Sequence, residues 1–284
     1  MFRLQIDSIL IWILRICAGI SAAIILFIAI FLVSESLPAL HKIGLQAIFS
    51  DASWHPQENL FNLLPMLWGT LTVALGAMII ATPLGILSAI FCQYVAPPTT
   101  AKTYRKLVEL LAGIPSVVYG FWGLVVITPI IAQWQAPGAS LCAAILILAL
   151  MVLPTIALMT DAALANVPKS YIDTAASLGL SPYTTVVNIV MPVAKRGIIT
   201  ALLLATGRAI GETMAVLMVA GNVVQIPTSI FDPIRTLTAN IALEMAYAMN
   251  DHRAALFASA LILLIIVSLL VIAADTIEKH QTYA

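Results

Sequence analysis

Long continuous stretches of apolar residues alternate with shorter polar segments along the chain. Six of these stretches reach the length of about 20 residues that a helix needs to cross a membrane. They comprise residues 9–33, 66–95, 108–132, 139–160, 197–220 and 255–274. Because backbone groups in lipid must bond within their own segment, continuous runs predict helices, whereas a membrane barrel would show alternating strands. We therefore expect an all-α polytopic membrane protein with six transmembrane helices.

The composition supports this class and excludes several others. Of the 284 residues, 62% are hydrophobic and only 9% are charged, and the formal net charge is zero. Soluble proteins carry about 25% charged residues, and nucleic-acid-binding proteins show a basic excess. A soluble enzyme, a disordered chain and a nucleic-acid binder are all excluded by these values.

Basic residues predict the orientation, because lysine and arginine gather in cytoplasmic loops. One side would hold Arg3, Lys102, Arg105, Lys106, Lys169, Lys195, Arg196 and Lys279, and the other would hold Lys42, Arg235 and Arg253. We expect both termini to be cytoplasmic.

The first helix, within residues 1–34, is predicted to be retained rather than cleaved as a signal peptide. An outer loop (35–65) and a core domain (66–284) follow, with a cytoplasmic loop (161–196) and an outer loop (221–253), in which 237–249 is expected to be helical at the outer surface.

The sequence offers little for catalysis or metal binding. Cys17, Cys92 and Cys142 stand alone in apolar runs, the histidines are scattered, and no Gly-Lys dipeptide of a nucleotide-binding loop occurs. We expect no catalytic residue, no metal site and no cofactor bound by this chain.

The third predicted span is interrupted by helix-breaking residues at Gly113 and Pro115, followed by Ser116. Such a break can line a path or allow movement. Glycine and proline are also common in packed membrane helices, so ordinary packing is the alternative.

The cytoplasmic loop predicts two short helices. Ser170 and Asp173 have the spacing of a capping box, which would start a helix over 171–178. Gly179 would end that helix in a left-handed conformation. Ser181 and Pro182 would begin a second helix, which we expect to end at Pro192.

Small residues in this loop suggest a contact surface. Ala175, Ala176 and Gly179 would allow another surface to approach closely. Helices this short are marginal alone, so they must pack on a partner or on their own bundle. The spacing leaves both arrangements open.

The fifth predicted span carries two charges, Arg208 and Glu212, four residues apart. On one helix they would share a face and partly neutralise each other. Gly207 and Gly211 would form a close-packed helix interface beside them. Arg208, with Glu212 and the adjacent Thr213, could lie on the pathway of an anion, because the guanidinium fork matches oxyanions. A fixed ion pair that sets helix register is the alternative.

Several motifs resemble those of known transport proteins. Asp173-Thr174-Ala175, then Gly179, then Ile189-Val190-Met191-Pro192 are similar to the EAA loop of the permeases of ABC importers. The segments GRAIGETMAVLMVAGN (207–222) and LLAGIPSVVYG (110–120) resemble permeases of phosphate importers, particularly the PstC subunits. The outer segments IPTS (226–229) and DPIRTLT (232–238) show the same resemblance.

This resemblance implies a type I permease in a bacterial inner membrane. It implies a heterodimer with a PstA-like permease, two PstB-like ATPase subunits that bind ATP-Mg, and a PstS-like phosphate-binding protein outside. The EAA loop would dock on the ATPase, and the outer segments around 225–235 and 239–249 are candidates for receiving the binding protein. A permease for sulfate or molybdate, and an ATP-independent carrier with Glu212 as a proton relay, are the alternatives.

Overall fold

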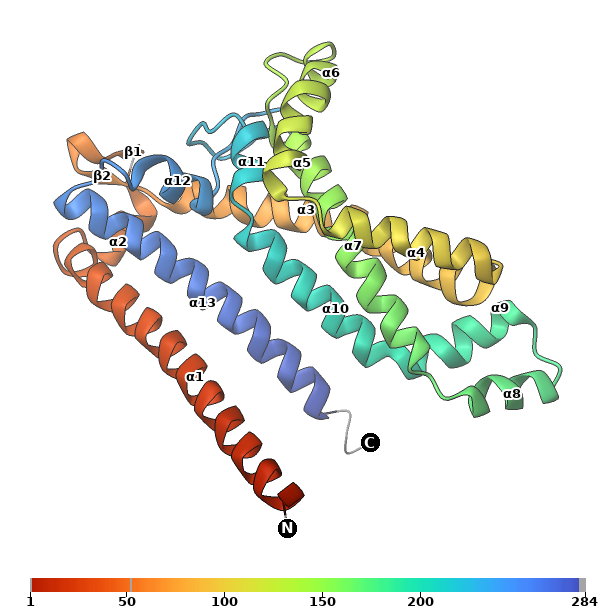
Figure 1. Cartoon of the computed structure of the whole chain (residues 1–284). Coiled ribbons are helices and arrows are strands. Elements are labelled where there is room, and N and C mark those ends of the chain that lie inside the picture. The colour runs from red at the N-terminus through yellow and green to blue at the C-terminus, as the bar shows by residue number, and fades with distance from the viewer. Residues whose placement is uncertain (1, 52, 281–284) are drawn as a thin grey trace.

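The computed structural model describes residues 2–51 and 53–280, except for the side chains of 2–9, 45, 47, 274, 275 and 277–280. Helices dominate it (Figure 1). They are α1 (Phe2–Lys42), α2 (Leu45–Ser50), α3 (Leu64–Ile90), α4 (Pro98–Ala112), α5 (Ser116–Trp122), α6 (Thr128–Ala132), α7 (Leu141–Ala165), α8 (Lys169–Ser177), α9 (Pro182–Thr185), α10 (Met191–Gly211), α11 (Met214–Val219), α12 (Leu237–Glu244) and α13 (Asn250–His280). Strands β1 (Trp54–His55) and β2 (Leu60–Phe61) form a small antiparallel hairpin.

The core lies where α3 packs against α7. Buried positions on α3 repeat every four residues and are mostly small, namely Gly69, Val73, Ala77, Ala81, Gly85 and Ala89. A stripe of small residues lets two helix backbones approach closely. The facing helix α7 buries larger side chains, such as Leu148, Val152 and Ile156, in the resulting groove. Ser140 caps the start of α7 by accepting a hydrogen bond from the backbone amide of Ala143.

The predicted spans are largely recovered, with one major change in the third. Within the described residues, five helices are long and apolar enough to cross a membrane. A sixth span results if α4 and the segment Ser116–Ala132 are counted together, but these two are bent by 89° at the break. The span predicted over 108–132 is therefore sharply bent, and the bend falls at the predicted break. Gly113 and Pro115 separate the two parts, because Pro115 lacks the amide that would continue the helix.

The fifth span also differs from its prediction. A continuous helical segment runs from Pro182 to Gly211 and includes α9 and α10. It ends at Glu212, whose backbone is extended at φ −67° and ψ 131°. The expected helix over 197–220 is thus broken, and α11 starts separately after it.

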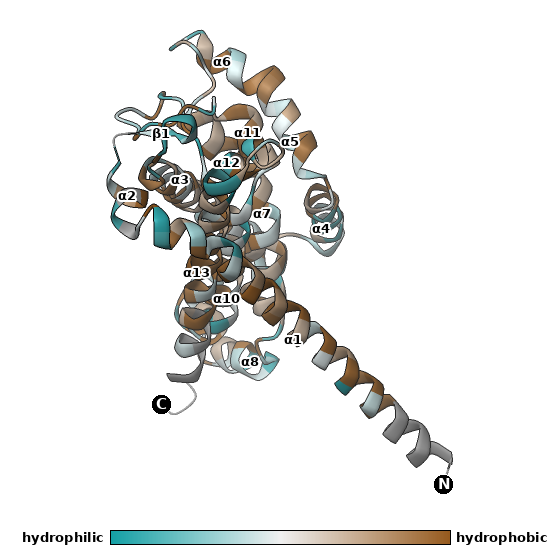
Figure 2. Ribbon diagram, turned by 90° about the vertical axis from the view of Figure 1, so that its left-hand side faces the viewer, coloured by the Kyte–Doolittle hydropathy of each residue, from teal (hydrophilic) through white to brown (hydrophobic). Residues whose placement is uncertain are grey.

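Helix α1 extends beyond the predicted 9–33, to Lys42. It packs on α13, where Phe31 meets the ring of Phe257 edge-on. Most of its apolar side chains stay exposed, and Figure 2 shows it projecting from the body of the molecule as an apolar rod. The start of α1 and the end of α13 both lie toward the side of the molecule that carries α8 (Figure 1). The side chains of Arg3 and Lys279, which entered the orientation argument, lie outside the described ones.

The opposite end holds the hairpin, α2 and α12 around a second apolar cluster that includes Trp54, Phe61 and Leu256. Helix α12 forms within the predicted 237–249 but ends at Glu244. Thr236 caps it by accepting from the amide of Ala239. Its first half is buried, so it is part of this cluster and does not lie on the surface throughout.

The α3–α7 contact leads to a stability prediction. A Cβ atom at Gly85 would lie 2.6 Å from Cγ2 of Ile156. Gly85→Ala should therefore destabilise the protein by about 1–3 kcal/mol through overpacking. The control is Gly19→Ala, since a Cβ atom there meets nothing within 4 Å. Thermal unfolding of the detergent-solubilised protein measures the effect, and equal midpoints for the two variants would contradict it.

Candidate functional site

Arg208 lies in the last turn of α10, and its side chain is exposed. Its Nη1 atom donates a hydrogen bond of 3.1 Å to Oγ1 of Thr155 on α7. The described residues contain no carboxylate in ion-pair contact with this guanidinium. The arrangement leaves a positive charge available on the surface of this chain.

The predicted pair of Arg208 with Glu212 is not formed. Glu212 terminates α10, and its Oε1 atom accepts a hydrogen bond of 3.1 Å from the amide of Ala215. The carboxylate therefore caps the start of α11, where the free amides of a helix favour negative charge. This local cap replaces the helical turn that would have brought the two charges onto one face.

The glycines beside these charges also depart from the prediction. A Cβ atom at Gly207 or Gly211 would meet nothing within 4 Å, so no helix among the described residues packs closely against them. Thr213 donates to the carbonyl of Gly211, and Thr238 donates to the carbonyl of Glu212. The end of α10 is thus held from one side and left open on the side of Arg208.

The break in the third span lies close to this charge. The hydroxyl of Tyr119 on α5 donates 2.9 Å to the carbonyl of Leu111, one of the free carbonyls at the end of α4. Among the described residues, no hydrogen bond joins the Tyr119 phenol to Arg208. Ser116 is half-buried in the first turn of α5, and no described contact joins it to Arg208. The break positions Tyr119, which the sequence did not single out.

The loop predicted to be cytoplasmic (161–196) forms the two predicted helices with altered ends. Helix α8 begins at Lys169, and neither Ser170 nor Asp173 makes a capping hydrogen bond, so the capping-box prediction is wrong. Pro168 precedes the helix and already fixes its start. Gly179 has φ +72°, and the amide of Leu180 donates to the carbonyl of Ala175, as in a Schellman ending.

The second helix of the loop begins as predicted. Ser181 accepts from the amide of Thr184, and Pro182 occupies the first turn. The helix does not end at Pro192, however. A π-helical turn over Val186–Val190 precedes the proline and lets the helix continue into α10. One helix therefore joins the loop to Arg208.

Large apolar side chains are exposed on these two helices. Tyr183 is 77% exposed, and Leu178 is 72% exposed. A groove of about 360 Å³ opens beside them, lined by Ser170, Tyr171, Thr174, Ala175, Leu178 and Ile189. Ala175 is buried and Ala176 is exposed, so only the second is accessible. Such a surface is typical of a contact site for another protein.

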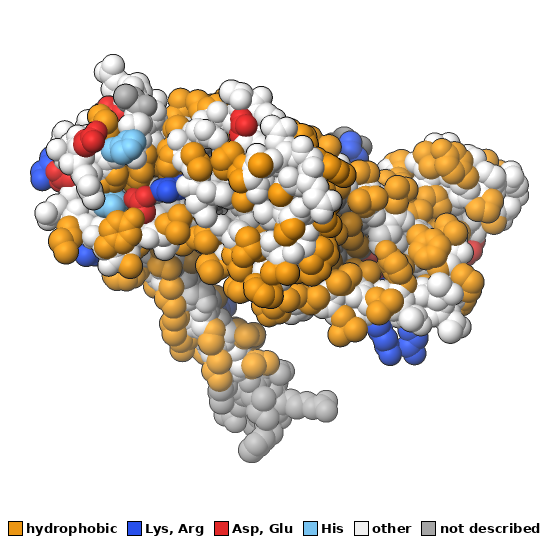
Figure 3. Space-filling view, turned by 90° about the horizontal axis from the view of Figure 1, so that it is seen from above, with side chains coloured by type: hydrophobic (Ala, Val, Ile, Leu, Met, Phe, Trp, Pro, Cys, Tyr) orange, Lys and Arg blue, Asp and Glu red, His pale blue; other side chains and the backbone are white. Residues whose placement is uncertain are grey.

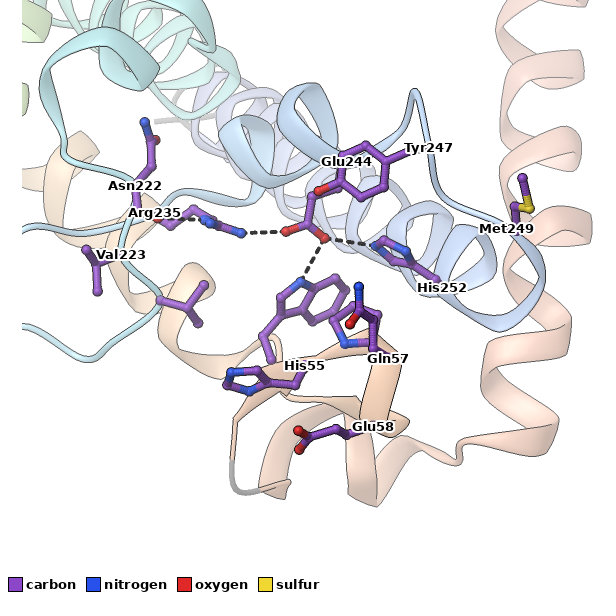
Figure 4. A pocket seen from close by; sticks show the side chains of 13 residues that line it. His55, Gln57, Glu58, Asn222, Val223, Arg235, Glu244, Tyr247, Met249 and His252 are labelled. Carbon is purple, nitrogen blue, oxygen red and sulfur yellow. Dashed lines mark hydrogen bonds and ion pairs between the residues drawn. The ribbon is translucent and has the colours of Figure 1, made fainter.

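A polar cavity of about 720 Å³ lies at the opposite end of the molecule (Figure 4). At its floor, the buried carboxylate of Glu244 accepts hydrogen bonds from Arg235 (2.6 Å), Trp54 (2.9 Å) and His252 (2.8 Å). Figure 3 shows acidic, basic and histidine side chains gathered at this end. The network ties β1, α12 and α13 together. Sequence reasoning missed it because Trp54 lies 190 positions from Glu244, and the irregular spacing of Arg235, Glu244 and His252 has no recognisable pattern.

Two ionisable groups at this end of the molecule, outside the membrane spans, have shifted pKa values. Hydrogen bonds from Ser229 and Thr228 lower the pKa of Asp232 below its ordinary value. Partial burial, together with the nearby Glu244 carboxylate, raises the pKa of Tyr247. Asp232 thus stays ionised and holds the loop between α11 and α12.

Comparison with known families identifies the architecture. The model of the binding-protein-dependent transport system inner membrane component family matches residues 81–282. The chain belongs to this family. It is accordingly a multi-pass permease of the ABC transporter type.

Individual relatives agree with this assignment. The chain is 38% identical to a probable ABC transporter permease protein, YqgH, of Bacillus subtilis, over 81% of this chain and 77% of the relative. It is 36% identical to the phosphate transport system permease protein PstC of Mesorhizobium japonicum, over 86% and 81%. The PstC protein of Xylella fastidiosa is 34% identical, over 86% and 84%.

Solved structures share the fold at lower identity. A chain of the MetNI methionine ABC transporter in an inward-facing conformation aligns with a TM-score of 0.62 at 20% identity, over 77% of this chain and 95% of that one. A chain of a bacterial alginate ABC transporter aligns with a TM-score of 0.60 at 14% identity, over 94% and 95%. The fold is that of type I ABC importer permeases.

The Glu244 network leads to a second stability prediction. Glu244→Ala should destabilise the protein by about 3–5 kcal/mol, because Arg235 would be left largely buried without its partner. Asp251→Ala is the control, since the pair of Asp251 with Lys42 is exposed and should contribute less than about 1 kcal/mol. Thermal unfolding of the purified protein compares them, and a loss of equal size in both variants would refute the prediction.

Proposed function

We propose that this chain is a permease subunit of an ATP-driven phosphate importer in a bacterial inner membrane. Its relatives named as phosphate transport permeases, at 34–36% identity over most of the chain, support phosphate as the substrate. Arg208 alone would suit sulfate or molybdate equally, because each presents tetrahedral oxygens to the guanidinium fork.

The observation that carries the proposal is the exposed, unneutralised charge of Arg208 on an open helix face. A charge in a membrane span is costly and normally faces a protein interior or a water-filled path. We place the phosphate path between this face and a second, PstA-like permease. Glu212 and Thr213 shape the end of α10 there, and Gly113, Pro115 and Ser116 form the bend that sets Tyr119 beside it.

Coupling to ATP is assigned to the cytoplasmic helices α8 and α9. Two PstB-like ATPase subunits would bind ATP-Mg and receive the exposed surface around Leu178 and Tyr183. The continuous helix from Pro182 to Gly211 would transmit their closure toward Arg208. This chain has no ATPase role of its own in the scheme.

A PstS-like phosphate-binding protein would dock at the end that carries the hairpin and α12.

The carrier alternative is less well supported. A proton relay requires a carboxylate that exchanges protons along a path. Glu212 instead accepts a hydrogen bond from the backbone amide of Ala215, so its carboxylate is engaged in a helix cap. An exposed surface at α8 and α9 is also unnecessary for a carrier that works without ATP.

Removal of the Arg208 charge tests the pathway. Arg208→Gln should reduce uptake of labelled phosphate by at least about tenfold, because a charge-assisted contact to the anion is lost. Arg15→Gln is the control, since Arg15 is an exposed arginine on α1 that lies over Trp12. Assembly is verified by co-purification of the partner subunits. Uptake at the unmodified rate in an assembled Arg208→Gln complex would rule out a direct role.

The energy source is tested in the same cells. Uptake should disappear when the partner ATPase lacks its nucleotide-binding lysine, and excess sulfate or molybdate should not compete with phosphate. Persisting uptake with the inactive ATPase would favour the carrier, and strong competition by another oxyanion would overturn the substrate assignment.

Docking on the ATPase gives a separate prediction. Tyr183→Ala should lower the amount of ATPase that co-purifies with this chain, because an exposed aromatic side chain at the contact would be lost. Trp134→Ala removes an equally exposed aromatic side chain outside the α8–α9 surface and should have no effect. Equal recovery of the ATPase with both variants would contradict this docking site.

A further inference from the structure

Thr155 contacts the Arg208 guanidinium directly. It lies half-buried on α7, immediately after Pro154. Its Oγ1 atom accepts a hydrogen bond of 3.1 Å from Nη1 of Arg208. The two residues lie on different helices and are 53 positions apart in the sequence. Neither its position nor its residue type marks it as part of a site in the sequence.

The hydroxyl proton of Thr155 remains available. Several threonines in other helices of this chain donate their proton to a carbonyl four residues earlier, as Thr72 does to Trp68 and Thr206 does to Leu202. For Thr155, no acceptor is found within the part of the chain that the structure describes. A hydroxyl can accept one hydrogen bond and donate another at the same time.

The guanidinium of Arg208 also has further N–H donors beyond the one that binds Thr155. Arg208 has five N–H donors in a planar fork, and its contact with Thr155 uses Nη1. The remaining donors and the Thr155 hydroxyl therefore lie next to each other at the open end of α10. They could bind two oxygens of one anion.

We infer that Thr155 is a second ligand of the transported oxyanion, and that its hydroxyl donates to one oxygen while Arg208 binds another. This inference rests on the proposed phosphate path. A neutral hydroxyl adds a directional hydrogen bond without adding a second positive charge. The site would thus gain affinity and still be able to release the anion.

Kinetics of labelled phosphate uptake by the complete transporter in cells test this role. Thr155→Val preserves the shape of the side chain and removes the hydroxyl, so KM should rise on the order of tenfold. Vmax per assembled complex should change little. Thr155→Ser restores a hydroxyl and should return KM to within about twofold of the unmodified value. Thr206→Val is the control, because that hydroxyl serves only its own helix and KM should stay unchanged.

Three outcomes would overturn the inference: an unchanged KM in Thr155→Val, equal impairment of Thr155→Val and Thr155→Ser, or an effect confined to Vmax. A threonine that only supports folding would reduce the number of assembled complexes and leave KM unaltered. The Arg208→Gln variant distinguishes a failure of the Thr155 role from a failure of the proposed phosphate path. If Arg208→Gln abolishes uptake and Thr155→Val has no effect, only the role of Thr155 fails. If Arg208→Gln transports normally, the proposed path fails.

Discussion

Close packing of α3 against α7 is the contact on which the other helices depend. Small residues at every fourth position of α3 bring the two backbones together, and the surrounding helices α5, α10, α11 and α13 pack on this pair. In lipid the hydrophobic effect does not drive helices together, so tight contact and hydrogen bonding must do so. The pair therefore positions both Thr155 on α7 and the helix that carries Arg208.

The charged groups at the two ends of this bundle differ in how fully they are paired. At the end that carries the hairpin, Glu244 is surrounded by three donors and stabilises the packing of β1, α12 and α13. At the end of α10, the carboxylate of Glu212 is engaged by a backbone amide, and Arg208 has no carboxylate partner among the side chains that the structure describes. The first arrangement serves structure, whereas the second leaves charge available for a ligand.

The sequence predicted the fold class, most spans and the positions of α8, α9 and α12, because apolar length, helix-ending residues such as Gly179 and the cap Ser181 are local signals. It did not predict the break at Glu212, where a side-chain cap competes with continuation of the helix. It also placed a helix end at Pro192, because a π-helical turn that accommodates proline has no sequence signature of its own. The contact of Thr155 with Arg208 and that of Trp54 with Glu244 join distant segments, which no local pattern reveals.

The uninterrupted helix from Pro182 to Gly211 has a mechanical consequence. Its 30 residues form a rod about 45 Å long at the usual rise of 1.5 Å per residue. If such a rod pivots near one end by about 5°, its far end moves by about 4 Å, which exceeds the length of a hydrogen bond. A small rotation about the end at Pro182 would therefore suffice to separate Arg208 from Thr155. The geometry of the rod alone would turn a modest displacement into the making or breaking of the proposed anion site.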